Sequence, residues 1–337
     1  MNIAKTIVLA SVLVVCLAGT VAQGDLVIDT VPVGNPGNAG ESSGGGSAGP
    51  IRTCGAVPYD YQIGKFEVTA AQYAAFLNAV ATTDTYGLYN AAMQWPDVYL
   101  GCNILRNGYP GSYTYSVAAD WANRPVNYVS WGDAARFCNW MHNGQPTGAQ
   151  HLTTTEDGSY LLDGATSDAA LMSVTRTPNA TWVIPTEDEW YKAAYHKNDG
   201  VTGNYWDSPT GTNAIPNNGN PEGDTGNTVN MLDSGGYAIG EPYFRTEAGF
   251  YAFSESPYGT FDQGGNVYEW VETPVASVRG LRGGSYGHDY FMVRALQRYG
   301  REPTSEFGWI GFRVGSIPEP TALALLAFAG LAMLRRR

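Results

Sequence analysis

Ser285 is surrounded in the sequence by side chains suited to nucleophilic chemistry. Residues 283–287 read Gly-Gly-Ser-Tyr-Gly, and His288 and Asp289 follow directly. The pattern matches GxSxG, the turn that presents a serine to an acyl group in many hydrolases. Such enzymes bring their histidine and their acid from distant loops, and residues adjacent in the chain are not expected to form that geometry. We therefore predict no acyl-transfer site at Ser285.

Residues 262–269 carry oxygen atoms in a layout that hard cations use. Asp262 and Glu269 provide carboxylates, and Gly265 and Val267 alternate between them. Calcium binds carboxylate and backbone carbonyl oxygens, and alternate residues of an extended chain direct their groups to one side. The simpler interpretation is a Gly-Gly-Asn turn that leads into a strand with an exposed glutamate. The octapeptide by itself favours the turn.

The cysteines form no metal-binding or redox motif. One of the four, Cys16, lies in the N-terminal apolar segment, which leaves Cys54, Cys102 and Cys138. No two of them are spaced as CxxC, so neither a zinc knuckle nor a thioredoxin-type site is supported. One disulfide plus a free thiol is compatible with an oxidising compartment, but the sequence does not identify the pair.

Three helices that could position these segments are predicted from capping residues. In each, a hydroxyl residue is followed three positions later by a side chain able to complete a capping box. The pairs are Thr69 with Gln72, Ser130 with Asp133, and Thr186 with Glu189. Apolar residues then recur at helical spacing, so each pair predicts the start of a helix with one buried face.

The strands and loops are predicted from apolar runs and from turn residues. Short apolar runs predict strands at residues 126–129, 267–271 and 310–314. Residues 200–265 are rich in Gly, Pro, Asn and Asp, so long irregular loops are expected there, and such loops are often functional. The predicted fold class is α+β with a high content of coil.

The N-terminal 56 residues are predicted to precede the folded domain. Residues 1–22 combine a cationic Lys5, an apolar run and the ending Thr-Val-Ala, which is typical of a cleavable signal peptide. Residues 23–56 are predicted to be a Gly/Ser-rich linker, because residues 34–50 offer too little apolar surface to offset the entropy of ordering them. Folding is expected to begin at residue 57.

The C-terminal segment, residues 316–337, has three parts in a characteristic order. A Pro-Glu-Pro motif is followed by an uncharged apolar stretch and by three arginines. These are Pro318, Glu319 and Pro320, residues 321–334, and Arg335, Arg336 and Arg337. The prolines favour an extended chain, the apolar stretch can form a helix that enters a bilayer, and the arginines hold its end on the cytoplasmic side.

This tail resembles the PEP-CTERM sorting signal of bacteria. The resemblance implies an exosortase as processing partner, cleavage near the Pro-Glu-Pro motif, and transient membrane contact through residues 321–334. Together with a signal peptide it implies an exported protein of the cell surface or extracellular matrix. The alternative is an ordinary membrane helix, or a helix packed on the domain.

The charge balance disfavours nucleic acid as a partner. Lys and Arg number 19 against 31 Asp and Glu, which gives a formal net charge of −12 at pH 7. Basic side chains that displace counterions supply most nonspecific affinity for phosphate backbones. An acidic chain of this kind is expected to attract cations instead.

Six segments of the sequence occur in an order that resembles a known family. They are Phe66-Glu67-Val68-Thr69, Val129-Ser130-Trp131, Pro185-Thr186-Glu187, Asn266-Val267 with Glu269-Trp270, Arg282-Gly283-Gly284-Ser285, and Gly311-Phe312-Arg313. Together they resemble the formylglycine-generating-enzyme, or sulfatase-modifying-factor, domain over residues 57–315. The resemblance implies one domain with a C-type-lectin-like core, little regular secondary structure and long loops.

The resemblance also identifies where the family's oxidative chemistry would take place. Family enzymes hold copper with two cysteines placed three and eight residues after the serine, and these positions are His288 and Val293. Cu(I) needs soft thiolate ligands, and Val293 has no donor atom, so no copper is expected. Another branch uses iron held by three histidines, but the four histidines here include no HxH or HxxxH pair. Tyr268, Ser285, His288 and Val293 are therefore interpreted as a degenerate groove.

The same resemblance strengthens the calcium prediction. It implies that Asp262 supplies a side-chain oxygen, Gly265 and Val267 supply carbonyl oxygens, and Glu269 supplies a carboxylate. Given this resemblance, a structural calcium site is favoured over the simple turn. Asn230 is a candidate for a second family site, but its loop differs too much to carry the role over.

Two functions follow from these observations. The first is a non-catalytic, surface-displayed protein that binds an envelope glycan or a protein ligand, or has a structural role. The second is an enzyme of altered chemistry, an oxidoreductase or hydrolase, that uses Ser285, His288 or Tyr268 in the old groove. A hydrogen bond between Ser285 and His288 within a deep cleft would favour the enzyme, whereas a shallow or filled groove would favour binding.

Overall fold

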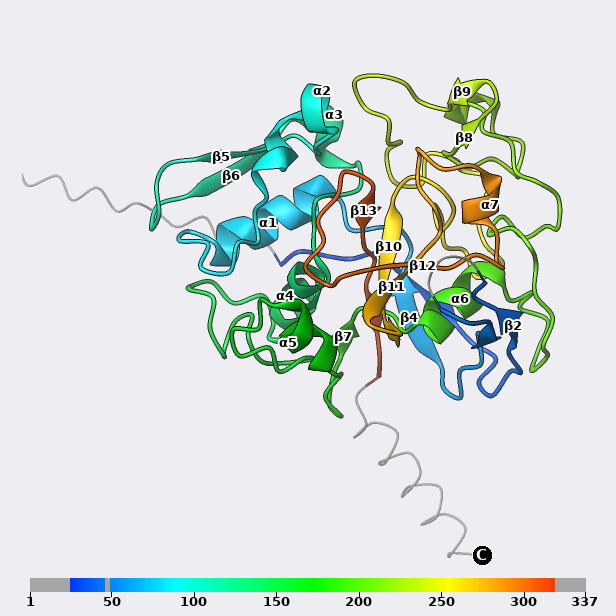
Figure 1. Ribbon diagram of the computed structural model, residues 1–337, viewed down its shortest axis with the longest axis horizontal. Coiled ribbons are helices and arrows are strands. Elements are labelled where there is room, and N and C mark those ends of the chain that lie inside the picture. Colours follow the sequence, from blue (N-terminus) through cyan, green and yellow to red (C-terminus); the bar gives the residue numbers. More distant parts are fainter. Residues whose placement is uncertain (1–24, 46–48, 319–337) are drawn as a thin grey trace, which may run out of the picture.

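A computed structural model of the chain describes residues 25–45 and 49–318 (Figure 1). The predicted signal peptide, residues 1–22, and the predicted sorting tail from Glu319 onward lie outside the described residues; of the Pro-Glu-Pro motif only Pro318 is included. Within the described ranges, no helix has both the length and the apolar character needed to cross a bilayer.

The three longest helices begin where the capping residues predicted them. They are α1 (Ala70–Val80), α4 (Trp131–His142) and α6 (Glu187–Tyr195), and each has a complete capping box formed with the preceding hydroxyl residue. The shorter helices are α2 (Pro96–Tyr99), α3 (Ala119–Ala122), α5 (Asp168–Ser173) and α7 (Tyr290–Val293), with 3-10 turns η1 (Ala91–Gln94) and η2 (Pro221–Gly223). Local sequence thus determined these starts.

Two four-stranded sheets lie at the centre of the molecule (Figure 1). The first has the order β1-β4-β14-β7, from Thr30–Val33, Tyr61–Gly64, Gly315–Ser316 and Trp182–Val183. The second has the order β12-β11-β10-β13, from Tyr299–Arg301, Val278–Arg282, Tyr268–Val275 and Ile310–Gly311. In the second sheet β10 runs antiparallel to β11 and parallel to β13.

Three hairpins complete the described strands. They are β2 (Glu41–Ser43) with β3 (Arg52–Cys54), β5 (Ile104–Asn107) with β6 (Thr114–Val117), and β8 (Leu232–Asp233) with β9 (Gly236–Tyr237). The predicted α+β class with long loops is therefore confirmed. Most of residues 200–265 is irregular, as the Gly- and Asn-rich sequence predicted.

The strand predicted at residues 126–129 is wrong. Val126 donates its N–H to the carbonyl of Val68, but the ladder does not continue, because Tyr128 has a φ of 57°, in the left-handed region. Extended strand geometry requires negative φ at successive residues. The other two predicted strands are present as β10 and β13, the latter only two residues long.

The linker predicted over residues 23–56 is also wrong for its described residues. β1 extends the first sheet beside β4, and β2 and β3 pair with each other. Polar side chains of this segment reach buried partners: the Asn38 amide donates to the Gly55 carbonyl and to the Tyr205 hydroxyl, and Ser43 donates to the Ala295 carbonyl. The prediction from composition failed because long-range hydrogen bonds, together with buried apolar residues such as Val33, order the segment.

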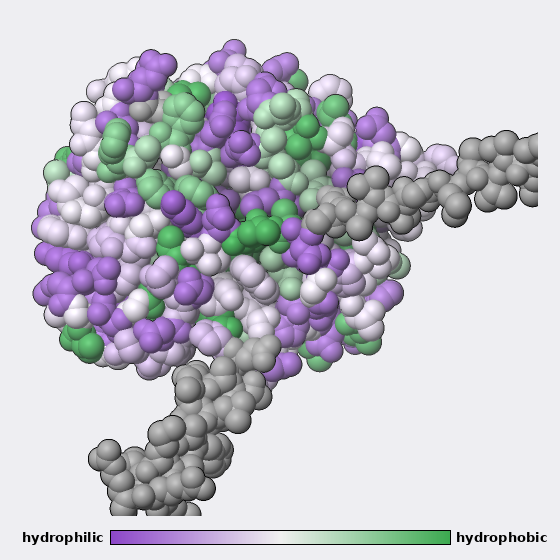
Figure 2. Space-filling model, turned by 180° about the vertical axis from the view of Figure 1, so that it is seen from behind, coloured by the Kyte–Doolittle hydropathy of each residue, from purple (hydrophilic) through white to green (hydrophobic). Residues whose placement is uncertain are grey.

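The core combines aromatic packing with buried ion pairs. Tyr73 and Phe76 of α1 pack with Phe137 of α4 and with Phe312 after β13. Three buried arginines pair with glutamates, Arg136 with Glu156, Arg282 with Glu187, and Arg313 with Glu269. On the face shown in Figure 2, hydrophobic residues form small groups separated by hydrophilic ones. Removing one partner of a buried pair would leave an uncompensated charge, so these pairs constrain the fold strongly.

All three cysteines of the described chain are free and buried. Cys54 of β3, Cys102 and Cys138 of α4 form no disulfide with one another. Burial raises the pKa of the Cys54 thiol to about 11. The thiols therefore pack as small apolar groups and are poor nucleophiles at neutral pH.

Candidate ligand-binding site

Ser285 follows β11 on a turn that only glycine accommodates. Gly283 and Gly284 have φ of 95° and 73°, and a Cβ on Gly283 would lie 2.8 Å from the Gln263 carbonyl oxygen. The turn brings the Ser285 hydroxyl within 2.7 Å of His288 Nδ1. The contact forms because the turn folds His288 back over the serine.

The Ser285–His288 pair nevertheless lacks the surroundings of a catalytic pair. Ser285 is fully buried, and burial lowers the pKa of His288. The neighbouring acid, Asp289, caps α7 by accepting a hydrogen bond from the Phe291 N–H at 3.1 Å. A serine nucleophile needs an exposed hydroxyl and an acid that orients the histidine. The structure therefore pairs the two residues without presenting the hydroxyl to solvent.

The second family cysteine position is occupied by apolar packing. Val293 is fully buried in a cluster with Val229 and Met231, against which Tyr290 packs. A Cβ placed on Gly264 would meet the Val293 side chain at 2.8 Å, which shows how closely the valine fills this space. Since protein interiors are close-packed, no volume is left here for an ion and its ligands. The groove predicted to be degenerate is filled at this position.

Aromatic rings surround the other side of His288. Tyr268 at the start of β10 lies with its ring centroid 4.9 Å from the imidazole, and Trp309 lies 5.7 Å from it. Tyr299 packs on Tyr268 at 5.5 Å, and the Arg301 guanidinium lies 5.0 Å from the Tyr299 ring. His288 is thus held as one ring of an aromatic cluster, where edge-to-face contacts stabilise it.

The predicted calcium ligands are brought together only in part. The Glu269 carboxylate accepts hydrogen bonds from Arg313 at 2.5 and 2.7 Å and from the Trp190 indole at 2.6 Å. Asp262 accepts from the Gly249 N–H at 2.5 Å, and burial raises its pKa to about 6. The Glu269 carboxylate is thus already paired with Arg313, and calcium would have to compete with that pair for it.

A further buried acid, Glu67, lies near the predicted calcium ligands Asp262 and Glu269. Among the described residues, no three His, Cys, Asp or Glu side chains converge on a point that could hold a metal. Glu67 of the first family segment is fully buried, and neither of its carboxylate oxygens has a hydrogen-bond partner. Burial, and then the charges of Asp262 and Glu269, raises its pKa well above the usual range. Calcium binding here stays a prediction, and Glu67 is a buried acid that the sequence analysis did not single out.

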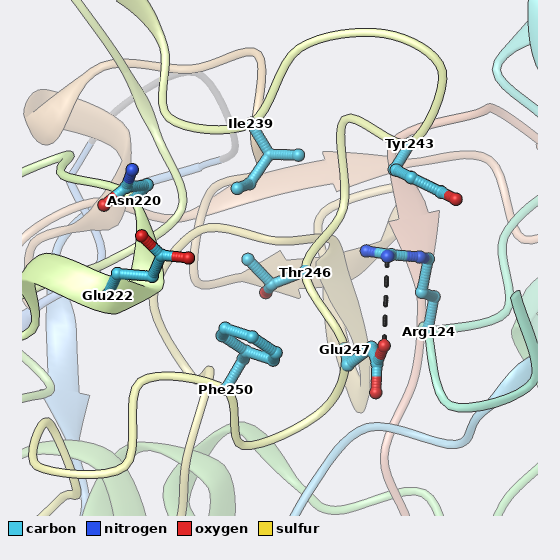
Figure 3. A pocket seen from close by; sticks show the side chains of 8 residues that line it. All are labelled: Arg124, Asn220, Glu222, Ile239, Tyr243, Thr246, Glu247 and Phe250. Atoms are coloured by element: carbon cyan, nitrogen blue, oxygen red, sulfur yellow. Dashed lines mark ion pairs between the residues drawn. The ribbon is translucent and has the colours of Figure 1, made fainter. Parts of the chain in front are cut away.

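A pocket of about 270 Å³ lies elsewhere, between the loop that follows α3 and the long loop region (Figure 3). Its lining combines apolar, aromatic and charged side chains from three stretches of chain. These are Arg124, Asn220, Glu222, Ile239, Tyr243, Thr246, Glu247 and Phe250. We call it the loop pocket. Concave sites with apolar walls and a few polar groups are the usual form of ligand sites.

The floor of the loop pocket is tied to a family segment. Thr246 donates its N–H and its hydroxyl to the side-chain oxygen of Asn266, at 3.0 and 3.3 Å. Asn230 donates to the same oxygen at 3.1 Å and to the Phe244 carbonyl at 2.9 Å. Asn230, considered above for calcium, therefore positions the floor of the pocket. Buried hydrogen bonds that converge on one oxygen in this way hold a loop in one conformation.

Arg124 forms one wall of the loop pocket and is held by contacts with other residues of the protein. It donates to the backbone carbonyls of Asp120 and Arg245, and its guanidinium stacks 3.8 Å from the centroid of the Tyr243 ring. Glu247 lies 4.0 Å from it, the contact dashed in Figure 3. Burial lowers the pKa of Arg124. Arg124 is thus held in place by two hydrogen bonds and by stacking on Tyr243, and only 11% of its side chain is exposed.

Sequence reasoning did not identify the loop pocket. The one relevant signal was the prediction that residues 200–265 form long loops, which are often functional. No local motif marks the lining residues, because they come from separate stretches that only the fold brings together. Conversely, Ser285, His288 and Tyr268 lie together as expected, but in a packed region.

The family model described as "Sulfatase-modifying factor enzyme 1-like domain" matches residues 13–316. No curated protein sequence is similar enough to count as a relative. Among solved structures, Treponema denticola variable protein 1 aligns with 21% identity and a TM-score of 0.54, covering 88% of this chain and 97% of that one. This likeness supports the fold, and the predicted C-type-lectin-like fold of the formylglycine-generating-enzyme type is confirmed.

Two further structures are similar over comparable lengths. CarF aligns with 20% identity, a TM-score of 0.48, and coverage of 87% of this chain and 99% of that chain. PvdO from Pseudomonas aeruginosa aligns with 17% identity, a TM-score of 0.48, and coverage of 86% and 94%.

Proposed function

Because this chain belongs to the sulfatase-modifying factor enzyme 1-like family, we propose that it is a non-catalytic member that binds a ligand in the loop pocket. The observation that carries the proposal is the packing of Val293. The position where a family enzyme needs a thiolate holds a fully buried valine in an apolar cluster. Copper binding of the family type would need both a donor atom and space, and this position offers neither.

The state of the other groove residues supports the same proposal. Ser285 is enclosed, and His288 is held between it and the aromatic rings of Tyr268 and Trp309. A filled groove favours a binding function over an enzyme of altered chemistry. The loop pocket, in contrast, presents Phe250 with 47% of its surface exposed and Glu222 in an exposed position. Exposed aromatic and charged groups around a hollow favour recognition.

Export to the cell surface is part of the proposal and rests on the sequence. The apolar N-terminal segment and the Pro-Glu-Pro tail with its terminal arginines support secretion followed by exosortase processing. An acidic chain with few cations suits a protein that remains soluble outside the cell. The ligand is then an envelope glycan or an envelope protein.

A binding assay with the purified full chain tests the proposal. The protein is applied to a glycan array and to a peptide library, and hits are measured again with Phe250→Ala and with the matched exposed variant Phe291→Ala. Ligands that require Phe250 but not Phe291 support the loop pocket. In parallel, oxygen consumption is measured with thiol peptides, with and without copper. Robust turnover would overturn the non-catalytic proposal, and the lack of any ligand would leave a structural role only.

The Ser285–His288 hydrogen bond is the one observation that favours a hydrolase. A fluorophosphonate probe, which labels activated serines, tests this second candidate against a Ser285→Ala variant. We expect no labelling, since the hydroxyl is buried. Labelling that disappears in Ser285→Ala would establish an activated nucleophile and favour the enzyme.

A further inference from the structure

We infer that the loop pocket binds the side chain of a lysine or arginine from a partner polypeptide. This inference rests on the proposed function and specifies the chemistry of its ligand. The lining of the pocket includes two carboxylates, those of Glu222 and Glu247. Glu222 comes from η2, and its carboxylate points into the hollow toward Thr246 in Figure 3. Among the described residues it takes part in no hydrogen bond or ion pair, so its oxygens are open to a ligand.

Glu247 provides the second open carboxylate. Its single charged contact is with Arg124 at 4.0 Å, which is the limit of an ion pair, and 39% of its side chain is exposed. Two carboxylates with free acceptors therefore belong to the lining of one hollow. A group that only donates hydrogen bonds and carries positive charge, such as an ammonium or a guanidinium, suits acceptors of this kind.

The two arginines at the pocket, Arg124 and Arg245, direct their hydrogen bonds mainly to backbone carbonyls and not to Glu222 or Glu247. Arg124 donates to two backbone carbonyls and stacks on Tyr243. Arg245, which precedes Thr246, is fully buried and donates to the carbonyls of Leu100, Gly101 and Gly308. Arg245 is enclosed by the protein, and only 11% of the Arg124 side chain is exposed. An anionic ligand would therefore reach few donors here, whereas a cationic ligand finds exposed acceptors.

The walls of the pocket match the stem of a basic side chain. Phe250 lies beneath the hollow and Ile239 above it in Figure 3, with Glu222 between them. Lysine and arginine place an alkyl stem against apolar surface while their charged end reaches polar groups. An amino sugar carries the same charge and can place a C–H face on Phe250, but its ring hydroxyl groups need hydrogen-bond partners that Ile239 does not provide. An unbranched alkyl stem needs no such partners, so the apolar walls favour a polypeptide side chain.

The test uses the full chain and short acetylated peptides, Gly-Ser-X-Ser-Gly amides. X is lysine, arginine, norleucine or glutamate, and a glucosamine trisaccharide is included. Binding is followed by ligand-observed NMR. We expect binding of the lysine and arginine peptides, at least about tenfold weaker binding of the norleucine peptide, and none of the glutamate peptide. Raising the salt concentration should weaken the lysine complex, because the carboxylates are partly exposed.

Matched variants locate the interaction. Glu222→Gln and Glu247→Gln should each weaken the lysine peptide about three- to tenfold, since each loses a charge-assisted contact in a partly exposed site. Glu255→Gln, which changes an exposed acid outside the pocket lining, should leave affinity unchanged. Thermal melting confirms that the variants remain folded.

Each outcome bears on the inference. Equal affinity for lysine and norleucine, preference for the glucosamine trisaccharide, or insensitivity to Glu222→Gln would overturn it. If the arrays yield a Phe250-dependent ligand while the lysine peptide does not bind, the inference fails and the binding function stands. If no ligand of any class binds, the proposed function itself fails.

Discussion

The region around Ser285 and the loop pocket are neighbours that differ in how their polar groups are satisfied. Asn266 joins them, since its backbone carbonyl accepts from the Tyr286 N–H and its side chain accepts from Thr246. On the Ser285 side, the serine, the histidine and Val293 contact one another or the core. On the pocket side, two carboxylates face solvent without strong partners. A family scaffold can thus fill one site and keep a second one open beside it.

The largest expected effect concerns the ion pair beneath the Ser285 region. Glu269→Gln should lower the free energy of unfolding by about 3–5 kcal/mol, because it leaves the Arg313 guanidinium buried without its counter-charge. Urea denaturation in EDTA and in calcium measures this. An equal loss in both buffers assigns Glu269 to the ion pair, whereas a loss confined to the calcium buffer would make Glu269 a calcium ligand, as the sequence predicted. Glu255→Gln is the control.

A smaller loss is expected from the cluster that fills the second metal position. Val293→Ala should cost about 2 kcal/mol, from the lost apolar burial and the cavity that remains. Differential scanning calorimetry of the variant against Phe291→Ala, an exposed neighbour in α7, makes the comparison. If both variants melt like the unchanged protein, the cluster is loosely packed and the region is more open than its contacts indicate.

A pH-dependent contribution to stability is expected from Glu306, whose carboxyl group lies beside Asn90 and Asp133, away from both regions. Burial, and then the charge of Asp133, raises the pKa of Glu306 to about 9. Because the folded state binds this proton more tightly than the unfolded state, the contribution is complete below the ordinary glutamate pKa and is lost as the pH rises toward 9. Glu306→Gln keeps a neutral side chain and should flatten the decline between pH 6 and pH 9 in urea denaturation. A variant that declines as steeply as the unchanged protein would assign the pH dependence to other groups.

The smallest effect on stability is expected in the loop pocket. Phe250→Ala should change the free energy of unfolding by less than about 0.5 kcal/mol, since the ring is half exposed. The same variant should weaken ligand binding about tenfold or more, because an exposed ring that closes over a ligand contributes mainly to the complex. Chemical denaturation and the binding assay are compared on one preparation. A large loss of stability would make Phe250 a core residue and remove the contrast between the two regions.

The sequence predicted what depends on neighbouring residues. The capping boxes at Thr69, Ser130 and Thr186 require contacts only three residues apart, and all three are present. The sequence also predicted that copper is not bound in the family manner, because Val293 has no donor atom in any fold. The fold class followed from an ordered series of segments, and the family match agrees with it.

The tertiary structure decided which groups meet and which remain open. It ordered the Gly-rich N-terminal segment through hydrogen bonds such as Asn38 to Gly55, and it matched Glu269 to Arg313. It also turned His288 onto Ser285 and assembled the loop pocket from separate loops. These outcomes depend on distances between residues far apart in the chain, or on a turn held by glycines. Composition and local spacing carry no information about such distances, so only the folded molecule could show where a ligand fits.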